Sequence, residues 1–253
     1  MKPYTQLTID IYEGSGDFDT AVLYAGGVRG AIIRLNDMNG GHHQDNRFNE
    51  YWKLFEQFAR APYFVFNPWV SAQANYDWLS AHIPPECKTI FIDIEVRYDG
   101  ISSSAYAAAI EQFMRMSQQR WHSVIYTGYG FYDLLSRWPT CEYWWAQYPN
   151  VVDWSTIKTW EQLQQSLDTV YIPANKQYIP GVLRMWQFSG DKLLLPGTER
   201  TIDCNQFYGT EDELQAFFND IKSPQLPPPT GEDPLLVARV AELERRIDNI
   251  KAL

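Results

Sequence analysis

The sequence has few cysteines, and their spacing gives them no shared task. Cys87, Cys141 and Cys204 are the only three in 253 residues, and they lie far apart. An odd number of isolated cysteines supplies neither a disulfide framework nor the close pairs of a zinc site. The adjacent His42 and His43 stand in a glycine-rich loop, where neighbouring side chains point in different directions. We therefore expect reduced thiols and no bound metal.

Long apolar runs are also missing. No stretch of about eighteen uncharged apolar residues occurs, and the N-terminal residues lack the apolar core of a signal peptide. Hydrophobic residues make up 45% of the chain and aromatic residues 15%, which is enough for one sizeable core. The composition therefore predicts a soluble globular protein without membrane insertion and without a classical export signal.

Basic residues are outnumbered by acidic ones. The chain has 21 Lys and Arg against 31 Asp and Glu, a formal net charge of -10. Nucleic-acid binding needs a basic surface for the phosphates, so no nucleic-acid partner is expected. Residues 13–17 read Glu-Gly-Ser-Gly-Asp, which lacks the third glycine of a dinucleotide-binding loop and is acidic. We therefore expect no cofactor.

Short apolar segments alternate with segments of helical periodicity along most of the chain. Strands are predicted at residues 7–12, 30–35, 63–67, 89–95, 123–127, 143–147, 169–172 and 183–188, and helices at residues 49–61, 72–81 and 104–121. A repeated strand, helix, strand order indicates a parallel sheet closed into an α/β barrel. The expected fold is a modified (β/α)8 TIM-like barrel with shortened later helices, and a doubly wound open sheet is the alternative.

Two carboxylates end the fourth predicted strand, in the sequence Phe91-Ile92-Asp93-Ile94-Glu95. Side chains alternate along a strand, so Asp93 and Glu95 project to one face while the isoleucines point to the other. Glycosidic bond cleavage uses such a pair, because one acid protonates the leaving oxygen while another carboxylate stabilises or attacks the sugar cation. Ion-paired or solvated strand-end residues are the alternative that this motif alone leaves open.

Other predicted strands also end in polar and aromatic residues. Catalytic groups of a barrel collect at the carboxyl ends of its strands. Asp10 stands at such an end with Asp93 and Glu95, and Asp203 follows the last predicted strand. Four carboxylates at one mouth exceed what structural pairing predicts, which favours an enzyme. The other side chains expected there are Arg34, Asn67, Trp69, Tyr126, Gln147, Tyr148 and Gln187.

The composition changes after the predicted barrel. Residues 223–231 read Ser-Pro-Gln-Leu-Pro-Pro-Pro-Thr-Gly, an extended polyproline-like spacer. Apolar residues then recur at heptad spacing, which predicts a coiled-coil-like helix. We expect a barrel at residues 1–221, a linker at 222–233 and this C-terminal helix at 234–253. So short a helix is marginal alone, and we expect it to form a homo-oligomer or bind an anchoring partner, with docking on the barrel as the alternative.

Several short motifs follow one another in a familiar order. They are Ile9-Asp10-Ile11, Asp93-Ile94-Glu95, Trp145-Ala146-Gln147-Tyr148 and Trp186-Gln187-Phe188, and then residues 202–207, Ile-Asp-Cys-Asn-Gln-Phe. Together they resemble the family 25 glycoside hydrolases, lysozyme-like N-acetylmuramidases common in phage endolysins. The resemblance implies a barrel enzyme that hydrolyses the β-1,4 bond between N-acetylmuramic acid and N-acetylglucosamine in bacterial peptidoglycan. In one departure, Arg34 stands where the family usually has a lysine-containing segment.

The resemblance also implies roles for the four carboxylates. Glu95 would be the general acid, and Asp93 would stabilise the sugar cation or orient its N-acetyl group. Asp10 and Asp203 would tune the pKa of Glu95 and bind sugar groups. An enzyme of this kind without an export signal would stay in the host cytoplasm until lysis or travel on a virion, and would act at the cell wall.

Substrate-binding roles follow from the same resemblance. Tyr126 is the candidate hydrogen-bond donor to the acetamido group. Trp69, Trp145 and Trp186 are candidate platforms on which sugar rings stack, with core packing as the alternative for each.

Two other functions stay open. A chitinase-like glycosidase expects a third Asp two residues before Asp93, and this chain has Phe91 there. A catalytically inactive wall-binding or phage-tail module is the alternative outside the enzymes, although all four candidate carboxylates are present.

Overall fold

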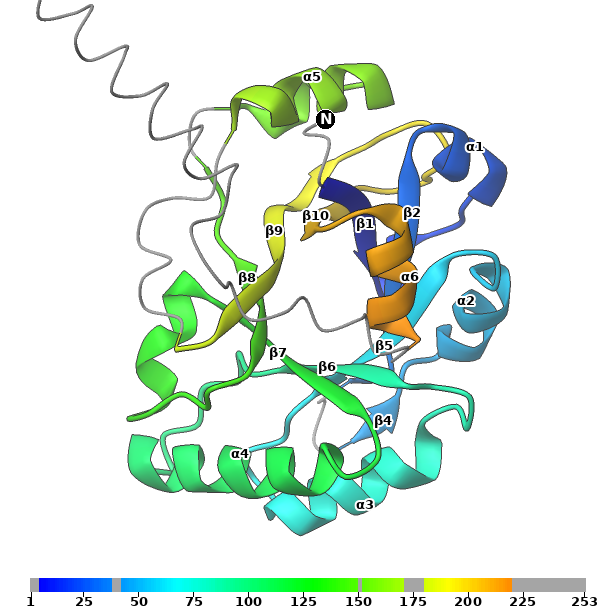
Figure 1. The fold of residues 1–253 in the computed structure, drawn as a ribbon. Helices are drawn as coiled ribbons and strands as arrows, with labels where there is room; N and C mark the ends of the chain where they lie inside the picture. The colour runs from blue at the N-terminus through cyan, green and yellow to red at the C-terminus, as the bar shows by residue number, and fades with distance from the viewer. Residues whose placement is uncertain (1–4, 38–41, 150–151, 171–179, 220–253) are drawn as a thin grey trace, which may run out of the picture. The chain divides into compact units, whose positions relative to one another are not determined.

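The computed structural model describes residues 5–37, 42–149, 152–170 and 180–219. Its centre is a closed eight-stranded barrel in the order β1-β10-β9-β8-β7-β6-β5-β2 (Figure 1). The barrel strands are β1 (Thr5–Ile11), β2 (Val28–Arg34), β5 (Ala59–Val65), β6 (Thr89–Asp93), β7 (His122–Gly128), β8 (Glu142–Ala146), β9 (Val182–Leu193) and β10 (Ile202–Tyr208). The predicted linker and C-terminal helix, residues 222–253, lie outside the described residues.

The prediction of a modified α/β barrel is confirmed, with one change of strand. The predicted strand at residues 169–172 is wrong at Thr169, which is the last residue of helix α5. The eighth strand is instead β10, which pairs antiparallel with both β1 and β9, whereas the other strand pairs of the barrel are parallel. Because β10 runs the opposite way, its first residues lie beside the last residues of β1, and Asp203 is paired with Asp10.

The predicted end of the helix before β5 and the predicted start of β5 are also wrong. The helix predicted at residues 49–61 ends at Leu54, and β5 already begins at Ala59. The strand was predicted to start only at residue 63, but the observed strand includes Pro62, which lacks the N–H that a central strand needs. Pro62 is tolerated because it pairs with Ile33 of β2, while pairing with β6 begins only at Tyr63.

Helices and short 3-10 turns surround the barrel, and α6 closes one of its ends (Figure 1). They are η1 (Glu13–Ser15), α1 (Thr20–Ala25), α2 (Phe48–Leu54), α3 (Ala72–His82), α4 (Ser103–Ser117), η2 (Tyr129–Leu134), η3 (Trp154–Thr156), α5 (Trp160–Thr169) and α6 (Glu211–Phe218), with a small hairpin of β3 (Asn36–Asp37) and β4 (His43–Gln44). The longest, α4, starts where the Ser102 hydroxyl accepts the Ala105 N–H. The helices after β7 are short, as predicted, and none in the described part of the chain is long and apolar enough to cross a membrane.

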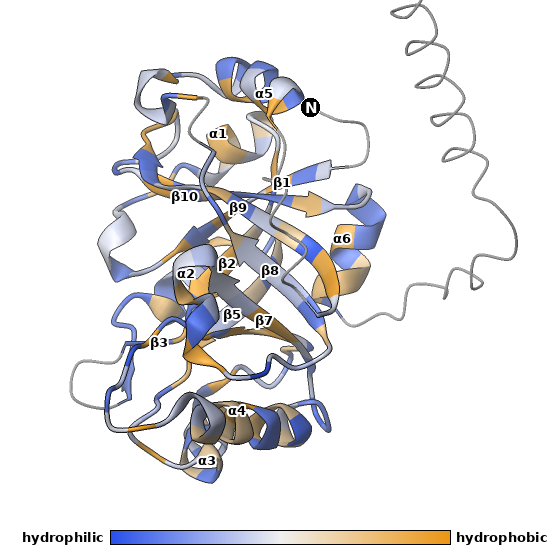
Figure 2. Ribbon diagram, turned by 90° about the vertical axis from the view of Figure 1, so that its left-hand side faces the viewer, coloured by the Kyte–Doolittle hydropathy of each residue, from blue (hydrophilic) through white to orange (hydrophobic). Residues whose placement is uncertain are grey.

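The barrel interior has an apolar end and a polar end. Helix α6 places Leu214, Phe217 and Phe218 against the inward side chains Phe91 and Trp144. In Figure 2 helices α4 and α6 carry both orange and blue residues, as expected of helices with one buried face. Since α6 fills the apolar end, the carboxyl ends of the parallel strands are left to form the mouth.

Candidate active site

The end of β6 delivers two acids to the barrel mouth. Phe91 packs inside the barrel, Ile92 and Ile94 are fully buried outside it, and alternation therefore turns Asp93 and Glu95 inward. The predicted shared face of the two carboxylates is thus confirmed. Gly128, at the end of β7, leaves room for the acid, because a Cβ there would lie only 3.0 Å from Glu95 Oε1.

Asp10 and Asp203 lie side by side on the antiparallel pair β1 and β10. The Asn205 Nδ2 donates to Asp10 Oδ2 at 2.9 Å, and the Gln187 Nε2 donates to both Asp10 oxygens at 3.1 Å. The same Gln187 nitrogen lies 3.4 Å from Asp203 Oδ2. Two amide side chains, Asn205 and Gln187, therefore hold Asp10 in one orientation.

Gln187 connects this acid pair to two tyrosines. Its Oε1 accepts hydrogen bonds from the Tyr126 and Tyr148 hydroxyls, both at 2.8 Å. An amide oxygen accepts and an amide nitrogen donates, so these partners fix which end of Gln187 faces which group. Tyr126, the candidate acetamido donor, is buried and already donates to Gln187, whereas the ring of Tyr148 is exposed.

Burial and mutual repulsion give the four acids different pKa values. Burial, and then the charge of Asp10, raise the pKa of Glu95 to about 7. Burial raises the pKa of Asp10 to about 6 against the lowering effect of its hydrogen bonds. Burial and the charge of Asp10 raise the pKa of Asp203 to about 9. Near neutral pH the mouth therefore contains both protonated and ionised carboxyl groups, which acid catalysis by a carboxyl group requires.

Asp93 differs from the other acids in having a buried oxygen without a hydrogen-bond partner among the described residues. Burial, and then the charges of Glu95 and Asp10, raise its pKa well above the ordinary value, and Arg34 lowers it. Its Oδ1 is buried, and no hydrogen-bond partner among the described residues reaches it. Buried polar atoms are rarely left unpaired in a folded protein. This oxygen is therefore free to accept a donor from a bound ligand.

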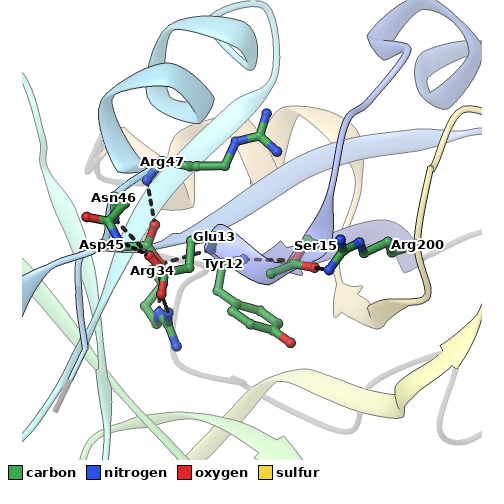
Figure 3. Close-up of polar contacts among 9 residues, drawn as sticks. Tyr12, Glu13, Ser15, Arg34, Asp45, Asn46, Arg47 and Arg200 are labelled. Atoms are coloured by element: carbon green, nitrogen blue, oxygen red, sulfur yellow. Dashed lines mark hydrogen bonds and ion pairs between the residues drawn. The ribbon is translucent and has the colours of Figure 1, made fainter. Parts of the chain in front are cut away.

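Arg34 is held in a network between the loops that follow β1 and β2 (Figure 3). Its Nε donates to Asp45 Oδ2 at 2.8 Å, and its guanidinium lies 4.7 Å from the centre of the Tyr12 ring. Asp45 also accepts the backbone N–H groups of Glu13 and Arg47. The sequence predicted Arg34 as a substrate ligand, and the structure shows that its nearest partner is Asp45.

Two exposed aromatic residues follow the carboxyl ends of β5 and β6. Trp69 is 49% exposed and Tyr98 36% exposed, and their ring centroids are 5.4 Å apart. Asn67, predicted as a substrate ligand, is instead buried, and its Oδ1 accepts the Trp69 N–H at 2.9 Å. Its own backbone is fixed by Asn75, which accepts its N–H at 2.8 Å. Asn67 therefore positions Trp69, and Trp69 keeps the exposed face that a sugar platform needs.

Two other predicted platforms belong to the core. Trp145 and Trp186 are almost fully buried, and each follows or precedes an inward residue on its strand, so both point outward from the barrel. The Trp145 Nε1 donates to Gln147 Oε1 at 3.1 Å, and the Trp186 Nε1 donates to the Gln147 carbonyl at 2.7 Å. The structure thus corrects the assignments of Trp145, Trp186 and Gln147 to the mouth, because these three residues pack together outside the barrel wall.

His42, the first histidine of the adjacent pair, serves packing, whereas His43 is exposed. The ring nitrogens of His42 lie 2.9 Å from Asn36 Nδ2 and 3.0 Å from Asn75 Oδ1. The His42 ring also stacks on Trp78 at 5.0 Å. In the part of the chain that the structure describes, no group of three or more His, Cys, Asp or Glu is placed to hold a metal ion.

Four residues of the mouth were not predicted from the sequence. Tyr12 contacts Arg34, Asn205 donates to Asp10, and Tyr63 is near enough to feel the charges of Arg34 and Asp10. Asp191 donates its backbone N–H to Asp203. Strand alternation could have revealed Asn205, two residues after Asp203, and Tyr63, two residues after the inward Ala61.

Comparisons with known proteins agree with this geometry. A family model of glycosyl hydrolases family 25 matches residues 9–194. The fold resembles a bacterial lysozyme from Streptomyces coelicolor, with TM-score 0.66 and 18% identity over 85% of this chain and 97% of that chain. It also resembles a family 25 glycosyl hydrolase from Bacillus anthracis, with TM-score 0.65 and 18% identity over 86% and 95%. The CTP1L endolysin gives TM-score 0.58 and 18% identity over 85% and 70%. A comparison with curated protein sequences gives no match.

Proposed function

The chain belongs to family 25 of the glycosyl hydrolases, and from that premise we propose that it is a lysozyme. Its reaction is hydrolysis of the β-1,4 bond between N-acetylmuramic acid and N-acetylglucosamine in bacterial peptidoglycan. The observation that carries the proposal is the inward pair on β6, where Glu95 has a pKa of about 7 beside a second buried acid, Asp93. Solved structures of lysozymes and muramidases with the same fold support it.

Glu95 acts first as acid and then as base. At a pH below about 7 it holds the proton that the glycosidic oxygen needs on departure. Once the leaving sugar has gone, the ionised Glu95 takes a proton from the attacking water. The charge of Asp10 raises the pKa of Glu95 and so keeps this proton available near neutral pH.

Asp93 faces the positive charge that develops on the sugar. As a carboxylate it stabilises an oxocarbenium or oxazolinium-like species, and its unpaired Oδ1 is free to accept the N–H of the 2-acetamido group. Burial and the charges of Glu95 and Asp10 raise the pKa of Asp93, so the ionised form is favoured only by Arg34, which lowers that pKa, and by the positive charge of the sugar itself.

The product identifies the bond that is cut. Purified peptidoglycan is incubated with the protein, the new reducing ends are reduced with borohydride, and the fragments are identified by mass spectrometry. Reducing N-acetylmuramic acid is the expected product. Reducing N-acetylglucosamine would keep the hydrolase and overturn the bond assignment, and release from chitin alone would favour a chitinase-like enzyme. Absence of release from several wall types would favour a wall-binding module.

The pH dependence tests the acid assignment. Because Glu95 must be protonated, we expect the rate of reducing-end release to fall about tenfold per pH unit above about 7. Asp10→Asn removes the charge that raises the pKa of Glu95, so the residual activity of this variant should decline at a lower pH. Rates measured from pH 4 to 9 at constant ionic strength decide the point. If the rate of Asp10→Asn falls at the same alkaline pH as that of wild type, the charge of Asp10 does not raise the pKa of Glu95.

We also propose that the enzyme works as a phage or prophage lysin, in the host cytoplasm until lysis or on a virion. The shared fold with the CTP1L endolysin supports this origin. The roles predicted for residues 234–253, oligomerisation or anchoring, fall outside the described residues and stay predictions.

A further inference from the structure

Strand β9 is bulged opposite Asp203. Leu193 pairs with Ile202 and Ser189 pairs with Cys204, so residues 190–192 of β9 face Asp203 alone on β10. Bulges of this kind re-aim side chains and backbone groups, and they are frequent next to active sites. The bulge therefore brings residues 190–192 to the mouth, where Asp203 lies.

Asp191, in the middle of the bulge, has an unusual backbone. Its φ of 45° lies in the left-handed region, and among the described residues it is the only non-glycine residue there. Asp and Asn adopt this region more readily than other non-glycine residues, and β-branched residues resist it strongly. In this conformation the Asp191 N–H donates to Asp203 Oδ1. The left-handed turn thus aims a backbone donor at one oxygen of the acid.

Gly190, the preceding residue, serves the same site. A Cβ at this position would lie 2.6 Å from the Tyr148 hydroxyl oxygen. That hydroxyl donates to Gln187, which in turn donates to Asp10. Two consecutive residues of one bulge therefore support the two acids Asp10 and Asp203.

The hydrogen bond from the Asp191 N–H to Asp203 Oδ1, called the backbone pin below, also locates the proton of Asp203. Burial, and then the charge of Asp10, raise the pKa of this acid to about 9, so it is protonated near neutral pH. A carboxylic acid has one O–H donor. Both oxygens accept an N–H, but the Asp191 N–H makes the short bond to Oδ1, whereas Gln187 Nε2 lies 3.4 Å from Oδ2, so the proton belongs on the more weakly bonded Oδ2.

Several groups around Asp203 titrate. It is faced by Asp10 from β1, Asp191 from β9, Tyr12 after β1, Tyr63 from β5 and Tyr148 after β8. The exposed carboxylate of Asp191 is one of the charges that raise the pKa of Asp203, after burial and Asp10. The backbone N–H of the same residue acts in the other direction and lowers it.

We propose that Asp191 is a positioning residue of the active site: its left-handed backbone pins Asp203 Oδ1, and its carboxylate adds a fifth acid to the mouth. This inference rests on the proposed hydrolase function for its effect on rate, but not for its effect on Asp203. A left-handed Asp at this point of β9 is thus part of the machinery that orients the acids.

Three variants separate the backbone pin from the charge. Asp191→Asn and Asp191→Gly both lose the carboxylate and keep a residue that accepts the left-handed backbone. Asp191→Val also loses the carboxylate, but its β-branched side chain opposes that backbone. The comparison of Asp191→Val with Asp191→Gly therefore reports the pin, and the comparison of Asp191→Asn with wild type reports the charge.

The first readout is the pKa of Asp203, followed by carbon-13 NMR of its labelled carboxyl group in the full chain. We expect a lower pKa in Asp191→Asn than in wild type, because a negative charge is removed. We expect a higher pKa in Asp191→Val than in Asp191→Gly, because the pin is lost. Equal values in Asp191→Val and Asp191→Gly would overturn the pin, and an unchanged value in Asp191→Asn would overturn the fifth acid.

The second readout is the rate of reducing-end release. We expect kcat of Asp191→Val to be at least about tenfold below that of Asp191→Gly, with KM changed by less than about threefold. Equal kcat in these two variants would overturn the positioning role. If wild type itself releases no reducing ends, the proposed function fails, and the NMR titration still decides the inference.

Discussion

Glu95→Gln should lower the rate of reducing-end release from peptidoglycan by about a thousandfold or more. General acid catalysis contributes typically 10²–10⁴-fold, and an amide cannot give up a proton to the glycosidic oxygen. The amide has nearly the shape of the protonated acid, so the fold should be unaffected. Turnover is measured as new reducing ends per enzyme at pH 6, and folding as the midpoint of thermal unfolding.

A matched variant controls for the loss of a glutamate. Glu56→Gln makes the same chemical change at an exposed position after α2, away from the barrel mouth. Its activity should equal that of wild type. Retention of a tenth or more of the wild-type rate in Glu95→Gln would remove Glu95 from the role of general acid and would leave another carboxyl group of the mouth as the candidate.

The shared inward orientation of Asp93 and Glu95 could be predicted from the sequence because strand alternation is a local property. The order Ile92, Asp93, Ile94, Glu95 fixes the inward face of β6 whatever the neighbouring strands do. The same rule, applied throughout, would have corrected Trp186. Gln187 was expected to face the mouth, and its neighbour on the strand must then point outward, where Trp186 is buried.

Other features depend on partners distant in the chain. The antiparallel course of β10 follows from its pairing with β1, and only this pairing brings Asp203 beside Asp10. The bulge at Asp191 is defined by the register between β9 and β10. Neither register leaves a periodic trace in the sequence. The acids and Gln187 could therefore be named from the sequence, and strand alternation could have added Asn205, but the bulge that orients Asp203 could not be predicted.

The four acids also explain why the site should limit the stability of the fold. Each is held at a raised pKa, mainly because burial disfavours its charged form. Such a group binds a proton more tightly in the folded state than in the unfolded chain. Folding is then favoured at acidic pH and loses free energy as the pH rises toward the folded pKa. The arrangement that prepares a proton for catalysis thus reduces stability at neutral pH.

Asp203→Asn should therefore stabilise the protein at pH 8 and leave it unchanged near pH 4. The pKa of Asp203 is raised from 3.8 to about 9, so in wild type unfolding at pH 8 releases a proton that Asn does not carry. One pKa unit corresponds to about 1.4 kcal/mol, and allowing for partial exposure and coupling to Asp10 we expect a gain of about 2–4 kcal/mol at pH 8. The Asn side chain keeps an oxygen for the Asp191 N–H, so the local structure should persist.

Thermal unfolding at pH 4, 6 and 8 measures the effect, and the difference between the two proteins should grow with pH. A gain of this size raises Tm by roughly 5–15 °C for a domain of this length. Asp99→Asn is the control, since it makes the same change at an exposed position, and it should show no such growth. A difference that is constant across pH would mean that Asp203 is ionised in the folded protein. The mouth would then hold one more negative charge at neutral pH, and the proton assigned to Asp203 Oδ2 would be absent.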